Sequence, residues 1–415
     1  MISERIRELE RSLDLSDPLH TLEAHQERVS AQIALAQAIL APWRRVPLEL
    51  WSEIFSYAPH DNWDVDPVDI RNLPLAEVCH VWRDLALHIP HLWTSIVVEV
   101  WEDFEEKPPL RPGLLKAVAT CLRRARTHPL HIRVVDQTFV WRGLNQYFAS
   151  DQGMRLWHQL CETTDRWETL ELGDMPSVSY AALSFKKLPI LRSLRFRLEE
   201  DPAPEGEDFA RTLRVFSNAP ALSVLNPGDA WVSPAFQLPT SWRLTSLDFQ
   251  YDTLSENSDV LPAFGAVLAC SQTLRECRIN SLCPDTIARG QLVEFVALEE
   301  LVLEDGGLLF MELIRAPKCR SLLALNLSDA CIRNIAVTLR RLPQLTALVV
   351  TDTDSQPGSF NTINDFCNLG QMLKRDPAQS DSLSLLPKLK RLAVRFGRTK
   401  NPRLDELIEE TTSSR

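Results

Sequence analysis

A leucine pattern that returns at nearly constant spacing constrains this 415-residue chain more than any other feature. The pattern is a leucine, two residues, a second leucine, one residue and a further apolar residue, with Trp167 in place of the leucine in the first copy. Copies start at residues 167, 191, 244, 274, 298, 322, 345 and 389, with a partial copy at Leu222. Three of the intervals between neighbouring starts are 24 residues long, and one is 23 residues long. A period of this size predicts stacked supersecondary units.

Within each copy, alternate residues are apolar, and this predicts a short strand with one buried face. The rest of a period, such as residues 334–341, favours a helix that returns to the start of the next strand. One unit cannot bury its leucines alone, so neighbouring units must share an elongated core. The predicted fold class is therefore α+β and multi-domain, in which N-terminal helices precede an irregular α/β solenoid.

This pattern resembles the leucine-rich repeat in an irregular form. The asparagine that usually follows the strand in that family is replaced by Gly306 and Ala330 in two of the best copies. The backbone along the bend must then be hydrogen-bonded in another way. Cys283 and Cys331 fall one residue later and are expected to pack as small apolar groups. The 44-residue gap from 345 to 389 is polar and is expected to be a surface loop, with part of a binding rim as the alternative.

Two segments before the repeat have the periodicity of amphipathic helices. In residues 47–57 the apolar positions are spaced by three and four, and residues 75–85 repeat that spacing. Pro47 and Pro74 precede these stripes, where a missing N–H has no cost. Short helices with wide apolar faces and large tryptophans suggest a surface for a partner chain. The alternative is that both stripes form an ordinary core.

The order of these residues resembles the F-box, the helical module that docks a protein onto the Skp adaptor of cullin–RING ubiquitin ligases. The resemblance covers residues 43–96, and its layout is most similar to the fungal branch of the family. Residues 59–71 depart from the family pattern by inserting an acidic run between the two halves. The matching residues are Val46-Pro47, Glu49, Ile54-Phe55, Val78-Cys79, Trp82-Arg83 and Leu92-Trp93.

The resemblance implies the substrate-recognition subunit of an SCF-type ubiquitin ligase, which binds the Skp adaptor, through it a cullin scaffold, and a target protein. Such a subunit is not an enzyme and needs no cofactor, because it contributes proximity and orientation. Some residues expected at the adaptor must build the core of the module instead. The expected adaptor-binding residues are Pro47, Leu48, Leu50, Ile54, Phe55, Val78, Cys79, Trp82 and Leu85.

Solenoids commonly bind partners on the face lined by their strands. The target is therefore expected to contact strand residues that point away from the core, although such a residue needs no function to be there. The expected substrate-binding residues are Arg195, Arg197, Asp248, Arg278, Glu304, Asn326, Thr351 and Arg395.

The composition excludes several classes of function. The net charge of −11 disfavours general binding to nucleic acid. Nine scattered cysteines without a Cys-x-x-Cys pair indicate a reducing compartment, cytoplasmic or nuclear, and no apolar stretch is long enough for a membrane span. Motifs of hydrolases, phosphate-binding loops and zinc proteases are missing. Two His-x-x-His pairs, at 88–91 and 128–131, adjoin prolines and lack further ligands, so no metal site is expected.

Residues 1–40 are expected to be helical, with a break near Asp17-Pro18. Leu22, Val29 and Ala36 recur every seven residues, which is the spacing of a coiled coil over fewer than three heptads. This segment, in particular residues 19–40, could support self-association as a dimerisation arm. The interpretation favoured by so short a pattern is a helix that packs back on the F-box or on the next domain.

The expected organisation has five parts. A helical or coiled-coil segment spans 1–41, the F-box 42–97, a linker helix region 98–128, the repeat solenoid 129–398 and a polar tail 399–415. Two other functions stay open. One is an F-box and repeat scaffold that acts in protein–protein interaction without a ligase. The other is an α/β enzyme whose units close into a barrel, which the short period and the missing motifs disfavour.

Overall fold

The computed structural model describes residues 22–32, 45–57, 74–100, 113–136, 147–148, 150–175, 177–184, 186–197, 213–227, 238–239, 241–251, 260–281, 292–305, 310–311, 313–325, 339–352 and 386–396. The chain is a mixed helix and strand protein built around a large parallel sheet.

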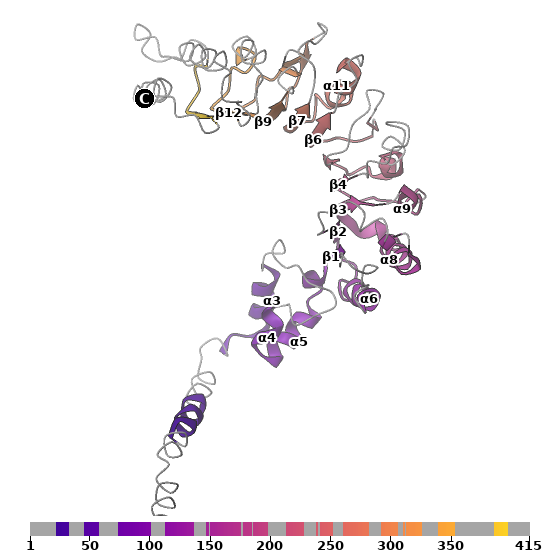
Figure 1. Cartoon of the computed structure of the whole chain (residues 1–415), viewed down its shortest axis with the longest axis vertical. Helices are drawn as coiled ribbons and strands as arrows, with labels where there is room; N and C mark the ends of the chain where they lie inside the picture. The colour runs from indigo at the N-terminus through magenta and orange to yellow at the C-terminus, as the bar shows by residue number, and fades with distance from the viewer. Residues whose placement is uncertain are drawn as a thin grey trace, which may run out of the picture.

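Eleven strands form this sheet, and each lies beside the strand that precedes it in the sheet along the chain. All ten pairings are parallel. The strands follow one another along an arc, with helices on its outer side (Figure 1). The strands are β1 (Ser95–Val100), β2 (Leu130–Asp136), β3 (Trp167–Asp174), β4 (Ser193–Arg197), β5 (Val224–Asn226), β6 (Ser246–Tyr251), β7 (Glu276–Ser281), β9 (Glu300–Asp305), β11 (Ser321–Leu325), β12 (Ala347–Asp352) and β13 (Arg391–Phe396).

The outer side carries α6 (Leu114–Arg124), α8 (Asp151–Cys161), α9 (Ser177–Ala181) and α11 (Val260–Ala269), as Figure 1 shows. Short 3₁₀ turns, η5 (Thr164–Arg166) and η6 (Phe216–Asn218), lead into or precede strands. A separate two-stranded parallel ribbon consists of β8 (Val293–Glu294) and β10 (Ile314–Arg315). Strands joined by outer helices and turns bury one face of the sheet, which leaves the other face for solvent or a partner.

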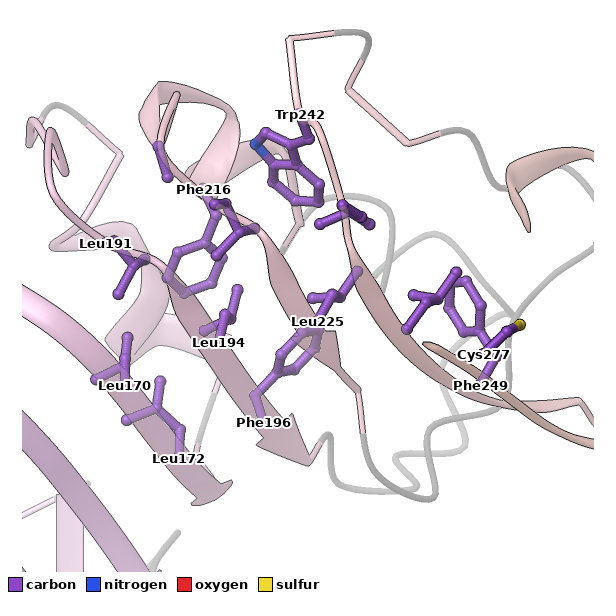
Figure 2. Packing of buried hydrophobic residues seen from close by; sticks show 14 of the residues in the cluster. Leu170, Leu172, Leu191, Leu194, Phe196, Phe216, Leu225, Trp242, Phe249 and Cys277 are labelled. Atoms are coloured by element: carbon purple, nitrogen blue, oxygen red, sulfur yellow. The ribbon is translucent and has the colours of Figure 1, made fainter. Parts of the chain in front are cut away.

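The second leucine of the pattern forms a buried ladder across the sheet. Leu170, Leu194 and Leu225 are in register with one another and are at most 1% exposed. Figure 2 shows these side chains on the same side of the strands, where Phe216 and Trp242 meet them. Phe196 stacks on Phe216 with ring centroids 6.3 Å apart. Because each leucine lies beside the leucine of the next strand, the period of the sequence becomes a continuous core.

The strands predicted from the eight full copies of the leucine pattern are confirmed as β3, β4, β6, β7, β9, β11, β12 and β13, and the partial copy forms β5. The helix expected at 334–341 lies mostly outside the described residues, as do Cys283, Cys331, Gly306 and Ala330.

The start of the repeat differs from the prediction. The expected linker helix region, 98–128, contains the helix α6, but the sheet begins before this helix, because β1 already pairs with β2. β1 buries Ile96 and Val98 on one face, and β2 buries Ile132 and Val134. These β-branched residues fill the leucine positions, so the leucine pattern does not reveal the first two strands.

The sheet does not close into a barrel within the described residues, because β1 and β13 are its two edges. The α/β-barrel enzyme is therefore excluded as an arrangement of these strands. No helix in the described part of the chain is long and apolar enough to cross a bilayer.

A helical module precedes β1 and consists of α3 (Leu48–Ser56), α4 (Pro74–Val78), α5 (His80–His88) and the 3₁₀ turn η4 (Pro90–Trp93). Pro47 is the residue immediately before α3, a position where its missing N–H has no cost. Cys79 caps α5, since its Sγ accepts a hydrogen bond from the Trp82 backbone N–H at 3.5 Å. The helix predicted from apolar spacing in residues 47–57 is present as α3. The helix predicted in residues 75–85 is divided into α4 and α5, because the backbone of Cys79 is extended. η4 leads directly into the sheet.

Candidate docking surfaces

An aromatic cluster holds the helical module together. Phe55 is 1% exposed, and its ring centroid lies 5.0 Å from that of Trp82 and 5.9 Å from that of Trp51. The Trp51 and Trp82 centroids are 4.4 Å apart. Trp93 is also buried, and its indole N–H donates to the Ala86 carbonyl at 3.0 Å. These contacts join α3, α5 and η4, so the large aromatics serve mainly as core.

The opposite side of α3 is apolar and open to water. Leu50, Ile54 and Tyr57 follow one another at helical spacing, and 50%, 51% and 78% of their surfaces are exposed. Phe55 points to the buried side, about 100° further around the helix from Ile54. Six of the ten large hydrophobic side chains exposed in the described residues belong to this module. We call this set the module's apolar surface: Leu48, Leu50, Ile54, Tyr57, Val78 and Val81.

The structure divides the nine residues predicted to contact an adaptor. Phe55 is buried, so it does not lie at the surface for which it was predicted. Phe55 lies on the side of α3 that faces Trp82, and its ring packs against the Trp82 ring. Cys79, Trp82 and Leu85 are half-buried, and the last two pack against the core. The residues left exposed are Pro47, Leu48, Leu50, Ile54 and Val78.

Two exposed residues of the apolar surface were missed by the sequence prediction. Tyr57 extends the stripe of Leu50 and Ile54 by one more turn, and that spacing could have revealed it. Val81 had no comparable signal, because neighbouring Trp82 and Val78 fit the periodic stripe better.

A positively charged junction connects the module to the sheet. The Arg124 guanidinium lies 4.3 Å from the ring centroid of Trp93, and the Arg166 Nε–H donates to the His128 carbonyl at 3.2 Å. Burial lowers the pKa of His91, and the nearby His128 and His131 lower it further. The two His-x-x-His pairs thus contribute three clustered imidazoles. The described residues contain no group of three or more His, Cys, Asp or Glu able to hold a metal ion.

The outward face of the sheet is polar over its first half, and its charges pair across neighbouring strands. Glu171 on β3 lies 3.7 Å from Arg195 on β4, and Arg278 on β7 lies 3.3 Å from Glu304 on β9. Between them, the Asn226 side-chain N–H donates to the Asp248 carboxylate at 3.1 Å. Such exposed pairs contribute at most about 1 kcal/mol each to stability. Their main effect is to neutralise this part of the face.

The predicted substrate-binding residues do not share one environment. Arg195 and Arg278 are exposed, and Asp248 and Glu304 are partly exposed. Thr351 is buried at 9% exposure, so it is not the surface residue that was predicted. It is in register with Leu325 of β11 and Arg395 of β13. Arg197 and Arg395 occupy positions in β4 and β13, and Asn326 lies outside the described residues.

Residues 22–32 form a helix in which every residue is exposed. Leu22 and Val29, the apolar positions of the heptad, are 66% and 39% exposed. The favoured interpretation, in which this helix packs back on the module or the sheet, is therefore wrong for these residues. Self-association through residues 19–40 stays a hypothesis.

The described cysteines are free thiols, and most belong to the core. Burial raises the pKa of Cys121 to about 11 and that of Cys161 and Cys319 to about 12. Cys270 and Cys277 are buried as well, and burial raises their pKa values. Neutral thiols in such positions are poor nucleophiles.

No protein-family model matches this sequence, and no characterised protein is significantly similar to it.

Proposed function

We propose that the protein is the substrate-recognition subunit of an SCF-type ubiquitin ligase, with an F-box in residues 45–94 and a leucine-rich-repeat-like solenoid from β1 onward. In this role the F-box docks the Skp adaptor and the repeats hold a target protein. The proposal combines the ordered F-box-like residues with one observation, the module's apolar surface on an aromatic core.

The apolar surface supports docking because such exposure is unfavourable in a free monomer. Leu50, Ile54 and Tyr57 keep half or more of their surface in water, although buried aromatics lie in the same module. Burying one such side chain contributes about 1.5–3 kcal/mol. Large apolar side chains that are exposed at successive turns of one helix mark an interaction site. The exposed residues lie in the segment whose sequence resembles the F-box, where the resemblance implies adaptor binding.

Co-purification with the Skp adaptor tests the proposal. The wild type is compared with Ile54→Asp, and Leu292→Asp is the matched control because Leu292 is equally exposed, at 52%, near β8. We expect the wild type and Leu292→Asp to capture the adaptor and Ile54→Asp to lose at least about 30-fold in affinity, the equivalent of about 2 kcal/mol. Circular dichroism confirms that each variant is folded. Failure of the folded wild type to bind, or equal binding by both variants, contradicts adaptor docking.

A scaffold that uses the F-box without a ligase is the alternative function. It shares the adaptor contact, so adaptor capture does not separate the two. The separating measurement is recovery of the cullin scaffold with the adaptor complex, followed by ubiquitin transfer to a bound target. A complex with adaptor but without cullin would favour the scaffold.

A further inference from the structure

The outward face of the sheet changes its chemistry between β7 and β9. The middle outward position is polar on β3 to β7, where Glu171, Arg195, Asn226, Asp248 and Arg278 occupy it. From β9 to β13 the same position, in unbroken register, is apolar. We call the residues at this position the apolar row: Val302, Leu323, Val349 and Ala393.

Water reaches the apolar row. All four side chains are partly exposed, whereas their neighbours on the inward face, such as Leu322 and Leu348, are at most 1% exposed. Leu325, two residues after Leu323 on β11, is also partly exposed. A solvated sheet face is normally polar, as β3 to β7 show. Four adjacent strands with apolar outward residues therefore indicate a surface that a partner covers.

The segments that carry β11, β12 and β13 are basic, whereas residues 292–305, which carry β9 and Val302, contain five acidic residues and no Arg or Lys. Among residues 313–325, 339–352 and 386–396, nine are Arg or Lys and one, Asp352, is acidic. This contrasts with the net charge of −11 for the whole chain. Arg391 is exposed and lies on the outward face of β13, two residues before Ala393. The nine are Arg315, Lys318, Arg320, Arg340, Arg341, Lys388, Lys390, Arg391 and Arg395.

Charge pairing distinguishes the two halves of the face. On the polar half Glu171 pairs with Arg195, and Arg278 pairs with Glu304 at the border. A ligand that binds there must desolvate groups that already have partners. On β11 to β13, a ligand displaces water from hydrocarbon and meets an excess of positive charge. The apolar half is therefore the more favourable place for a protein segment to dock.

We propose that Leu323 and Val349 of the apolar row, together with the exposed basic residues of β13 and of the turns before β11 and β13, form a docking site for an acidic protein segment that carries apolar side chains. Apolar side chains of the segment lie on Leu323 and Val349, and its carboxylates face Arg391 and the neighbouring lysines. This inference rests on the proposed function, for which it names the class of target. Nucleic acid is disfavoured because phosphates gain nothing from the apolar row.

Selection from a phage-displayed library of random 16-residue peptides on the immobilised full chain tests this site. We expect enriched peptides to be net negative, to contain at least two large apolar residues, and to bind more weakly as NaCl is raised. Val349→Thr keeps the shape of the side chain and should weaken binding at least fivefold. Arg391→Glu should weaken it at least tenfold, and Arg195→Ala on the polar half is the matched control.

Several outcomes would overturn the proposal. Enriched peptides of neutral or basic composition would do so, as would no enrichment above an empty surface. Binding that depends on Arg195 and not on Val349 would place the site on the polar half. A single-stranded oligonucleotide that binds more tightly than the best peptide, with sensitivity to Arg391 alone, would point to nucleic acid. Unchanged thermal unfolding of each variant excludes misfolding as the cause.

The peptide selection and the adaptor capture use different residues, so their failures are distinguishable. Adaptor capture without acidic peptides would contradict the docking site and leave the proposed function in place. Acidic peptides bound at Val349 and Arg391 without adaptor capture would support the docking site and contradict both the ligase subunit and the F-box scaffold.

Discussion

Replacing Phe55 and Ile54 by alanine, one at a time, tests the division of the helical module into core and surface. The two residues are neighbours on α3, yet Phe55 is 1% and Ile54 51% exposed. Phe55 also contacts the rings of Trp51 and Trp82. Phe55→Ala therefore leaves a cavity and should lower the free energy of unfolding of the module by about 3–5 kcal/mol. Ile54→Ala removes a half-solvated side chain and should cost about 1 kcal/mol or less.

Hydrogen exchange followed by mass spectrometry measures this difference locally. A loss of 3 kcal/mol corresponds to a rate increase of more than about 100-fold for amides that exchange through opening of the module. Peptides that cover α3 and α5 should show this acceleration in Phe55→Ala and less than about tenfold acceleration in Ile54→Ala. Peptides that cover β9 and β11 report on the sheet and should be unchanged. Equal acceleration by the two variants, or a larger effect of Ile54→Ala, would refute the division.

Three further predictions concern the junction, the thiols and the sheet. Because the pKa of His91 is lowered in the folded state, the unfolded state binds more protons. The contribution of His91 to stability is therefore present above about pH 6.5 and is lost as the pH falls through the folded pKa. His91→Gln should make the free energy of unfolding depend less on pH between pH 7 and pH 5, and an unchanged pH dependence would contradict this. Iodoacetamide should label partly exposed Cys79 in the native protein before buried Cys277, and the reverse order by mass spectrometry would show that Cys277 is accessible. Thr351→Val removes a buried hydroxyl that has no hydrogen-bond partner among the described residues. The substitution should leave stability to urea equal or raise it by about 1 kcal/mol, whereas a clear loss would mean that this hydroxyl is bonded.

The strands of the sheet were predictable because the leucine pattern is a local signal. A strand with one buried face must alternate, and a stacked unit must repeat, so Leu194 and Leu301 could be assigned without neighbours. The first two strands were not predictable in this way. Ile96 and Ile132 fill the core position of Leu170 with β-branched residues, and only pairing with β3 reveals that they continue the sheet.

The candidate sites were predictable only in part. Helical spacing predicted which residues of the module are apolar, but Phe55 and Ile54 satisfy the same pattern and lie on different sides of α3. Similarly, Thr351 occupies an outward strand position and is nevertheless buried, because coverage depends on the strands beside it. The substrate residues were chosen for their polarity, and this choice missed the apolar row.

By itself, the sequence determined the period of the repeat, the identity of most strands and the presence of two amphipathic helices, since each depends on spacing within one segment. Only the tertiary structure decided which apolar residues face water, which charges pair, and that Val302, Leu323, Val349 and Ala393 meet in one row. The physical reason is that burial and pairing are properties of neighbours in space. Residues 91 positions apart in the chain, such as Val302 and Ala393, become parts of one surface only when parallel register aligns their strands.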